Sequence, residues 1–230
     1  DYIEGTTRYS LYPDLSNGAA TADLTNPSSF SSDVDQYNSD GYRIKNGGAN
    51  TNATYNSRNY VSWTFRKAPG FFDIVTWVGD GTTKEIPHNL GSTPGFVMAK
   101  KLSQSGSWYC EHIDTTPKQI KINETGGEGT YLSNSILGAS NPATHIRADD
   151  GSLSSTGQTY IAYIFANNDQ QFGTDEDESI IKCGMYTGNG TTNSFTVGFE
   201  PQWILIKNID NNKQWCIFDH IRGAFPGSNQ

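Results

Sequence analysis

Much of this sequence occurs twice, and this repetition limits the folds open to the chain more than any other feature. Residues 72–83 return as residues 181–192 with matched positions 109 apart, and residues 93–112 return as residues 200–219 with matched positions 107 apart. A repeat of this length is domain-sized and well above the unit of a solenoid, so it predicts two tandem domains of one fold. The two residues lost between the blocks are expected in a loop, where insertions and deletions are tolerated.

Two further traces extend the repeat. Residues 59–65 (NYVSWTF) return as residues 159–165 (TYIAYIF) at an offset of 100, and Asp1–Gly5 resembles Asp219–Gly223 at an offset of 218, twice 109. The sequence therefore starts and stops at one phase of a longer array. We expect it to be a segment of a larger protein.

The composition and the residue alternation favour an all-β fold. The 230 residues include 24 Gly, 9 Pro and 12% aromatic residues, whereas runs of helix-favouring residues are nearly absent. Val61, Trp63 and Phe65 alternate with polar residues, which is typical of a half-buried strand. Many short strands and turns predict tandem antiparallel β-sandwich domains, jelly-roll-like, with long loops.

The repeat boundaries predict four regions along the chain. A loop-rich segment completes or flanks the first repeat, and a further repeat or tail begins after the second. The predicted regions are 1–41 (loop-rich segment), 42–114 (first β repeat), 115–223 (second β repeat, with a hairpin inserted at 118–123 and an acidic loop at 174–178) and 224–230.

Turns and central strands repeat in register. The Gly79-Asp80-Gly81 turn and its equivalent around Gly190 predict hairpins, because Gly, Asp and Asn tolerate the positive φ of tight turns. A phosphate-binding loop is a weak alternative, since no helix start follows the glycines. Residues 96–100 and 203–207 are apolar on both faces and are predicted to be central strands of a sandwich.

Charge and cysteine usage exclude several classes of partner. The net charge is −8, and no basic face that would neutralise phosphates is visible, so nucleic acid is not an expected partner. No apolar run reaches a membrane-span length of about 20 residues, so no membrane insertion is expected. Cys110, Cys183 and Cys216 show no CxxC spacing and are predicted to be buried free thiols, which fits assembly in a reducing compartment.

Candidate chemistry is sparse, and we predict no enzyme, no cofactor, no catalytic residue and no metal site. The four histidines lack metal-ligand spacing. The acidic loop at 174–178 could bind Ca²⁺, although four adjacent acids are more often a solvated loop. Glu85 and Glu111 have no acidic counterparts in the second repeat, which disfavours tandem hydrolase sites. The tryptophans, predicted to pack in the core, are Trp63, Trp77, Trp108, Trp203 and Trp215.

The repeated unit resembles tandem repeats in large virion structural proteins of marine tailed phages, especially cyanophage-type tail-fibre or appendage proteins. The resemblance covers residues 42–114 and 144–223. It rests on YVSWTFRKA at 60–68, FDIV at 72–75, IPHNLGSTPGFV at 86–97 and FDHIRG at 218–223. It implies a virion location, after assembly in the host cytoplasm, and no known catalytic residues.

Three functions follow as hypotheses. The first is a virion structural protein, a repeat segment of a tail fibre or other appendage that contacts other virion proteins and copies of itself as a homo-oligomer. The second is an adhesin module that binds host surface glycan through exposed aromatics such as Tyr55 or Tyr131. The third, a polysaccharide depolymerase, needs paired carboxylates in a cleft, which the repeats do not show.

Overall fold

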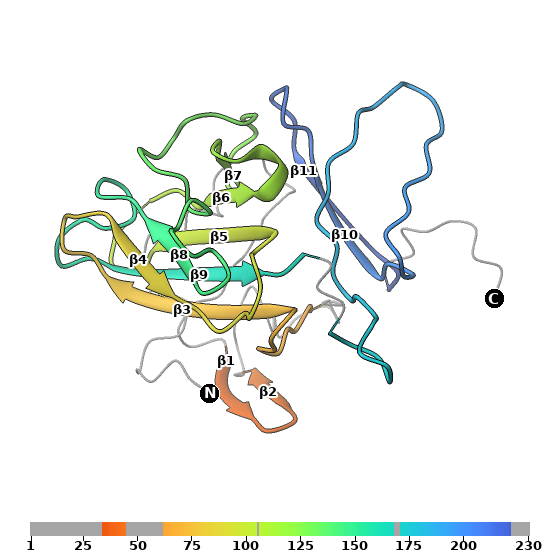
Figure 1. Ribbon diagram of the computed structural model, residues 1–230, viewed down its shortest axis with the longest axis horizontal. Helices are drawn as coiled ribbons and strands as arrows, with labels where there is room; N and C mark the ends of the chain where they lie inside the picture. Colours follow the sequence, from red (N-terminus) through yellow and green to blue (C-terminus); the bar gives the residue numbers. More distant parts are fainter. Residues whose placement is uncertain (1–33, 45–61, 105, 168–170, 222–230) are drawn as a thin grey trace, which may run out of the picture.

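A computed structural model describes residues 34–44, 62–104, 106–167 and 171–221 (Figure 1). This part of the chain forms eleven strands, and every pairing between them is antiparallel. The all-β expectation is therefore confirmed. Within these residues no helix is both long and apolar enough to cross a membrane.

A five-stranded sheet forms the centre of the molecule. Its order is β3 (Phe72–Val78), β9 (Thr159–Phe165), β5 (Phe96–Lys101), β6 (Tyr109–His112) and β7 (Ile120–Lys121). The strands are rich in β-branched and aromatic residues, which suit a pleated and buried surface. As predicted, β5 is a central strand, and its middle four residues are buried.

The core lies mainly on one face of this sheet, under a two-stranded ribbon of β4 (Lys84–Pro87) and β8 (His145–Ala148). Ile86 and Ile146, paired in the ribbon, belong to the same buried cluster as Trp77. A second, smaller cluster of Met98, Trp108 and Cys110 is formed by residues of opposite parity on β5 and β6. Side chains that alternate along a strand reach opposite faces, so both faces of the sheet carry apolar packing.

The Gly79-Asp80-Gly81 turn does not close a hairpin, contrary to the prediction. It leads from β3 to β4, and these strands pair with β9 and β8 respectively. The positive φ expected of the turn is present at Gly81, at 84°. The Gly and Asp residues therefore predicted the backbone conformation of the turn correctly. The two strands that the turn joins, however, do not pair with each other.

Other local expectations need correction. The strand expected from Tyr60 to Phe65 is not formed where it is described: residues 62–65 carry no strand pairing, and residues 60 and 61 lie outside the described residues. The hairpin expected at 118–123 is reduced to β7, which pairs with β6, and a bridge between Gln119 and Gly129.

The central sheet combines strands from both predicted repeats. β3, β5 and β6 belong to residues 42–114, whereas β7 and β9 belong to residues 115–223. The finer expectation of jelly-roll sandwiches in tandem is not confirmed by this arrangement. Of the predicted terminal regions, 224–230 and most of 1–41 lie outside the described residues.

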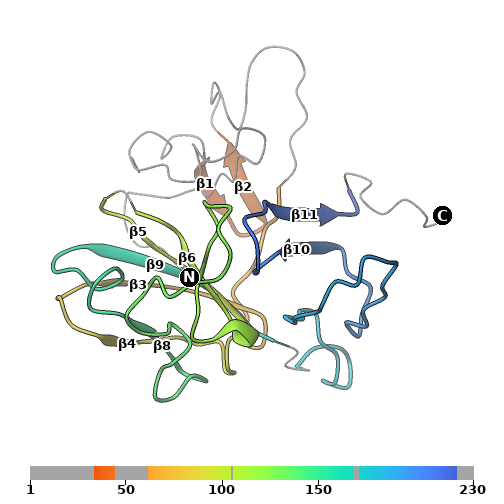
Figure 2. The same cartoon turned by 90° about the horizontal axis from the view of Figure 1, so that it is seen from above.

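Two separate hairpins complete the described chain. β1 (Val34–Asn38) pairs with β2 (Gly41–Ile44), and β10 (Trp203–Lys207) pairs with β11 (Trp215–Asp219). The β10–β11 hairpin stands apart from the five-stranded sheet in both views (Figures 1 and 2). Unlike β5, β10 is not buried on both faces, because the described residues form only a two-stranded ribbon there.

Candidate functional site

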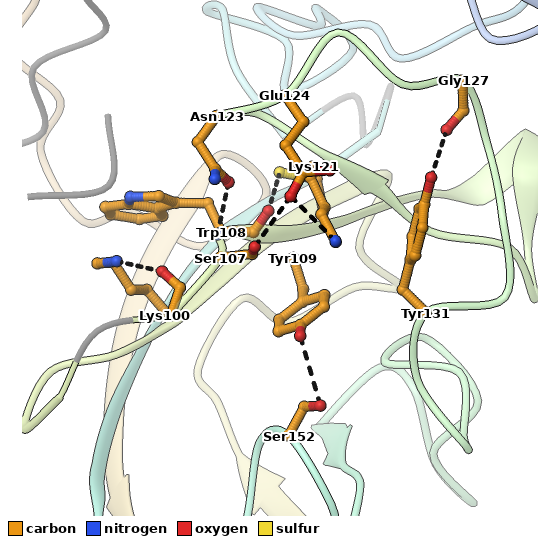
Figure 3. Close-up of polar contacts among 12 residues, drawn as sticks. Lys100, Ser107, Trp108, Tyr109, Lys121, Asn123, Glu124, Gly127, Tyr131 and Ser152 are labelled. Carbon is orange, nitrogen blue, oxygen red and sulfur yellow. Dashed lines mark hydrogen bonds and ion pairs between the residues drawn. The ribbon is translucent and has the colours of Figure 1, made fainter. Parts of the chain in front are cut away.

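An exposed tyrosine beside the β6–β7 edge is the candidate ligand-binding residue that the structure describes. Tyr131 is 36% exposed, and its hydroxyl donates to the Gly127 carbonyl at 3.2 Å (Figure 3). The Lys121 ammonium lies 4.5 Å from the centre of the Tyr131 ring and pairs with Glu124 at 3.0 Å. One face of the ring is therefore occupied by a cation of the protein itself. The other aromatic candidate, Tyr55, lies outside the described residues.

Two buried polar side chains hold the Tyr131 loop in place. Gln119 is fully buried, and its Oε1 accepts from the backbone N–H groups of Tyr131 at 3.0 Å and Leu132 at 3.1 Å. Its Nε2 donates to Glu111 at 3.3 Å. Buried polar groups are expected to find such partners, and here they are what positions the exposed ring.

Glu111 itself is a structural acceptor and does not face solvent. It is 0% exposed, and it accepts from the Ile136 N–H at 2.7 Å, from the Thr116 hydroxyl at 2.8 Å and from the Ser135 hydroxyl. Together with Gln119 Nε2, these donors occupy both carboxylate oxygens, so the side chain serves as a buried acceptor. The sequence marked Glu111 as unmatched in the second repeat but contained no signal of this anchoring role.

Glu85, the other carboxylate singled out from the sequence, lies at the surface. It accepts from the Ser140 N–H at 2.7 Å and from the Ser140 hydroxyl at 2.8 Å. These bonds, with a weaker contribution from Arg147, hold the pKa of Glu85 below its usual range. A general acid needs the opposite shift.

The histidines behave as structural residues where their contacts are described. His88 is buried; its Nδ1 accepts from the Leu90 N–H at 3.2 Å and its Nε2 faces the Pro142 carbonyl at 3.1 Å. Burial lowers the pKa of His88, so the ring is neutral at pH 7. Burial also lowers the pKa of His112, whose Nδ1 accepts from the Asp114 N–H.

Among the residues that the structure describes, no three His, Cys, Asp or Glu side chains are grouped so that they could hold a metal ion. The acidic loop at 174–178 is exposed throughout and forms a turn closed by a bridge between Phe172 and Glu178.

Cysteines and tryptophans follow the predictions in part. The three thiols are free, but only Cys110 is buried, whereas Cys216 is exposed. Trp77, Trp108 and Trp215 are buried as expected. Trp63 and Trp203 are more than a third exposed, because neither lies inside a described multistranded sheet. The prediction of core packing is wrong for these two.

A β-hairpin of the same strand register occurs twice in the described chain. β5 and β6 pair Phe96 with His112 and Met98 with Cys110. Their sequence equivalents 107 positions later, in β10 and β11, pair in the same register, for example Trp203 with Asp219. The repeat seen in the sequence is thus a repeat of strand pairing.

The lysines of the two hairpins also make equivalent contacts. Lys100 Nζ donates to the Gly106 carbonyl at 2.6 Å, and Lys207 Nζ donates to the Lys213 carbonyl at 2.9 Å. Each pair lies six positions apart and is related to the other by the offset of 107. Partial burial lowers the pKa of Lys207.

The second hairpin is docked on the loop beside Tyr131. Trp215 Nε1 donates to the Lys121 carbonyl at 3.1 Å, and the Glu128 N–H donates to the Ile209 carbonyl at 2.8 Å. Gly127 approaches the Ile209 carbonyl so closely that a Cβ there would collide with it. The second hairpin is therefore docked on β7 and on the loop that follows it, which extend the sheet that contains the first hairpin.

The described chain is an antiparallel β-sheet protein in which one hairpin pairing occurs twice. The chain belongs to the family described as a domain of unknown function (DUF7483), which matches residues 6–230. No curated protein and no solved structure gives a match.

Proposed function

We propose that this chain is a structural and interaction module, a repeat segment of a virion appendage such as a tail fibre. The observation that supports it best is the hairpin formed twice in one register, with the second hairpin docked on β7 of the central sheet. Structural units that recur along one chain are the elements from which repeat proteins are built.

The site chemistry supports a role without catalysis. The fully buried carboxylate of Glu111 is saturated by donors, and the pKa of the exposed Glu85 is lowered by its hydrogen bonds. Neither is placed as a proton donor for glycoside cleavage, which requires a carboxylic acid with a raised pKa. The partners of the module are other virion proteins and copies of itself.

Labelling of intact particles tests this proposal. An antibody raised against the chain is applied to purified virions of the phage that encodes it, and bound gold is located by electron microscopy. We expect label at regular positions along an appendage. Label found only in the soluble fraction of infected cells, with none on particles, would overturn the proposal.

A second candidate function, recognition of a host glycan, is favoured by the exposure of Tyr131 on a loop that the buried Gln119 side chain holds in place. Because Lys121 covers one ring face, a sugar would have to displace this cation or bind the remaining surface of the ring. A glycan array probed with the full chain and with Tyr131→Ala distinguishes the two functions. Binding that disappears in Tyr131→Ala supports recognition, and the absence of binding by either protein counts against it.

A further inference from the structure

One edge of β10 has no strand neighbour within the described chain, whereas the same edge of β5 is paired. The two strands are sequence equivalents, and β5 lies between β9 and β6 in the central sheet. β10 pairs with β11 on the edge that corresponds to β6, and no described strand takes the place of β9. Phe65 contacts the Trp203 ring, but residues 62–65 carry no strand pairing. The second hairpin therefore presents an open strand edge.

The backbone groups of three residues face this open edge. The His220 N–H donates to the Gln202 carbonyl at 3.2 Å, so the Gln202 carbonyl faces β11. Successive residues of an antiparallel strand direct their backbone groups to opposite neighbours. The N–H and C=O groups of Trp203, Leu205 and Lys207 therefore point away from β11. In the first unit, the equivalent edge of β5 pairs with β9. A row of such unpaired groups is a template for another strand.

β10 carries none of the features that usually protect an edge strand, which are a proline, a bulge or a charge near its middle. Its register with β11 runs from Trp203 to Lys207 without a bulge, and it contains no proline. Its single charge, Lys207, lies at the strand end, and its Nζ donates to the Thr125 carbonyl at 3.0 Å. Trp203 is 36% exposed, and the four residues that follow it are half-buried. The open edge is therefore accessible and mainly apolar.

The sequence of β10 is nearly symmetric about Leu205. Read outwards from this residue, it contains two isoleucines, then an aromatic residue and a lysine, then two amides: Ile204 and Ile206, Trp203 and Lys207, Gln202 and Asn208. A strand that meets its own copy antiparallel at a two-fold axis pairs each residue with the one equally far beyond the axis. About Leu205, this pairing sets Ile204 against Ile206 and Trp203 against Lys207, with no like charges opposed.

We propose that the open edge of β10 pairs with β10 of a second copy of this chain, antiparallel and with Leu205 on the two-fold axis. A sheet with the strand order β11, β10, β10, β11 then crosses the interface, and neither β10 edge stays open. A second copy is the occupant because the symmetric sequence fits its own reverse. β5, which pairs with a different strand, lacks this symmetry, since Val97 and Ala99 flank its centre. The inference deepens the proposed contacts between copies of the module and rests on that part of the proposed function, not on the virion location.

Disulfide cross-linking of the full chain tests this register. Single cysteines are introduced by Leu205→Cys, Ile204→Cys or Ile206→Cys after Cys183→Ala and Cys216→Ser, while the buried Cys110 is retained. Residues directly opposite each other across two strands lie within reach of a disulfide. Under mild oxidation, we expect Leu205→Cys to form disulfide-linked dimers about tenfold faster than Ile206→Cys, whose own copy lies diagonally across the axis.

A mixture of two variants is the matched control. Ile204→Cys and Ile206→Cys should each form dimers slowly alone and rapidly when mixed, because position 204 of one chain faces position 206 of the other. Equal rates for the three single-cysteine chains would indicate random collision or another register and would overturn the proposal. So would a mixture that reacts no faster than its components.

Sedimentation velocity measures the association without cross-linking. We expect the mass of the unsubstituted chain to rise with concentration from that of one chain to that of two. Leu205→Pro removes an N–H that faces the open edge, a position where a strand tolerates proline, so the hairpin with β11 should persist and the dimer should be lost. Leu205→Ala keeps this N–H and should still dimerise. Leu205→Pro that dimerises as well as Leu205→Ala would overturn the proposal.

The results for association and for location are independent. A chain that stays monomeric at every concentration up to the millimolar range overturns the β10 pairing, even if antibodies against it label an appendage. A chain that forms the Leu205-centred dimer but labels no particle supports the pairing and overturns the virion location.

Discussion

The rings of Phe65 and Phe165 lie 5.8 Å apart, edge to face, although the two residues hold the same position in the two copies of one sequence block. The two copies of the block therefore contact each other through the same position. The neighbouring pairs obey the same relation, since Phe65 packs on Trp203 as Phe165 packs on Phe96. Equivalent positions of the two copies thus lie in contact, which a string of independent domains would not require.

The buried Glu111 should be one of the most sensitive positions for stability. In Glu111→Leu, the Ile136 N–H and the hydroxyls of Thr116 and Ser135 lose their acceptor inside the protein. The Ile136 N–H is buried, whereas the two hydroxyls can reach water; a buried donor left unsatisfied costs about 1–3 kcal/mol, so we expect the free energy of unfolding to fall by about 1–3 kcal/mol. Urea denaturation followed by tryptophan fluorescence measures the change.

Glu85→Leu is the matched control for this experiment. Its carboxylate also accepts two bonds from one serine, but it lies at the surface, where water can replace the lost acceptor. We expect a loss of about 1 kcal/mol or less. An equal loss in both variants would contradict the anchoring role given to Glu111.

The sequence was sufficient to predict the repeat, the all-β class and the central position of β5, because alternation and composition report local structure directly. It was misleading at the Gly79-Asp80-Gly81 turn. A Gly-Asp-Gly sequence fits a hairpin turn and also a turn between strands of two different sheets. Here β3 pairs with β9, so the turn connects two sheets.

The candidate site was less predictable than the fold. The exposure of Tyr131 was anticipated, whereas its fixation by Gln119 and Glu111 depends on segments that come together only after folding. Trp203 was predicted to be buried because its block is apolar, and its exposure reflects a missing strand neighbour in the described chain. Sequence periodicity describes a strand but does not say which strand lies beside it.

Close backbone approach makes Gly79 difficult to replace. A Cβ at this position would collide with the Ser155 carbonyl oxygen and lie 2.8 Å from Ser154 Cα. Because these are backbone atoms, relief requires the turn to shift, and we expect Gly79→Ala to destabilise the fold by about 1–3 kcal/mol. Thermal unfolding by circular dichroism measures the effect.

Gly41→Ala serves as the comparison, because a Cβ there has nothing within 4 Å and its φ is not positive. We expect its free energy of unfolding to stay within about 0.5 kcal/mol of the parent chain. If Gly79→Ala were equally harmless, the β3–β4 turn and the 154–155 segment could not be as close as the structure places them.

Mild acid should destabilise the fold through His88. Burial lowers the pKa of His88 in the folded chain below the ordinary value of 6.5, so protonation favours the unfolded chain. The stabilising contribution is therefore complete above this ordinary value and is lost as the pH falls below it. We expect the urea midpoint to decrease from about pH 8 to about pH 5, and to decrease less in His88→Asn.

His220→Asn is the control for the pH experiment, because His220 is exposed. Burial also lowers the pKa of His112, so part of the pH dependence should persist in His88→Asn. A pH dependence identical in His88→Asn and in the parent chain would show that His88 is not the buried neutral group described above.

Thiol reactivity should separate the three cysteines by burial. Cys216 is exposed, whereas burial raises the pKa of Cys110 far above its ordinary value and raises that of Cys183 to about 12. The thiolate is the reactive form, so a disulfide reagent at about pH 8 should modify Cys216 rapidly and the other two slowly. In denaturant, all three should react. The fast phase should vanish in Cys216→Ser, and its persistence there would mean that Cys110 on β6 or the half-buried Cys183 is more accessible than the structure places it.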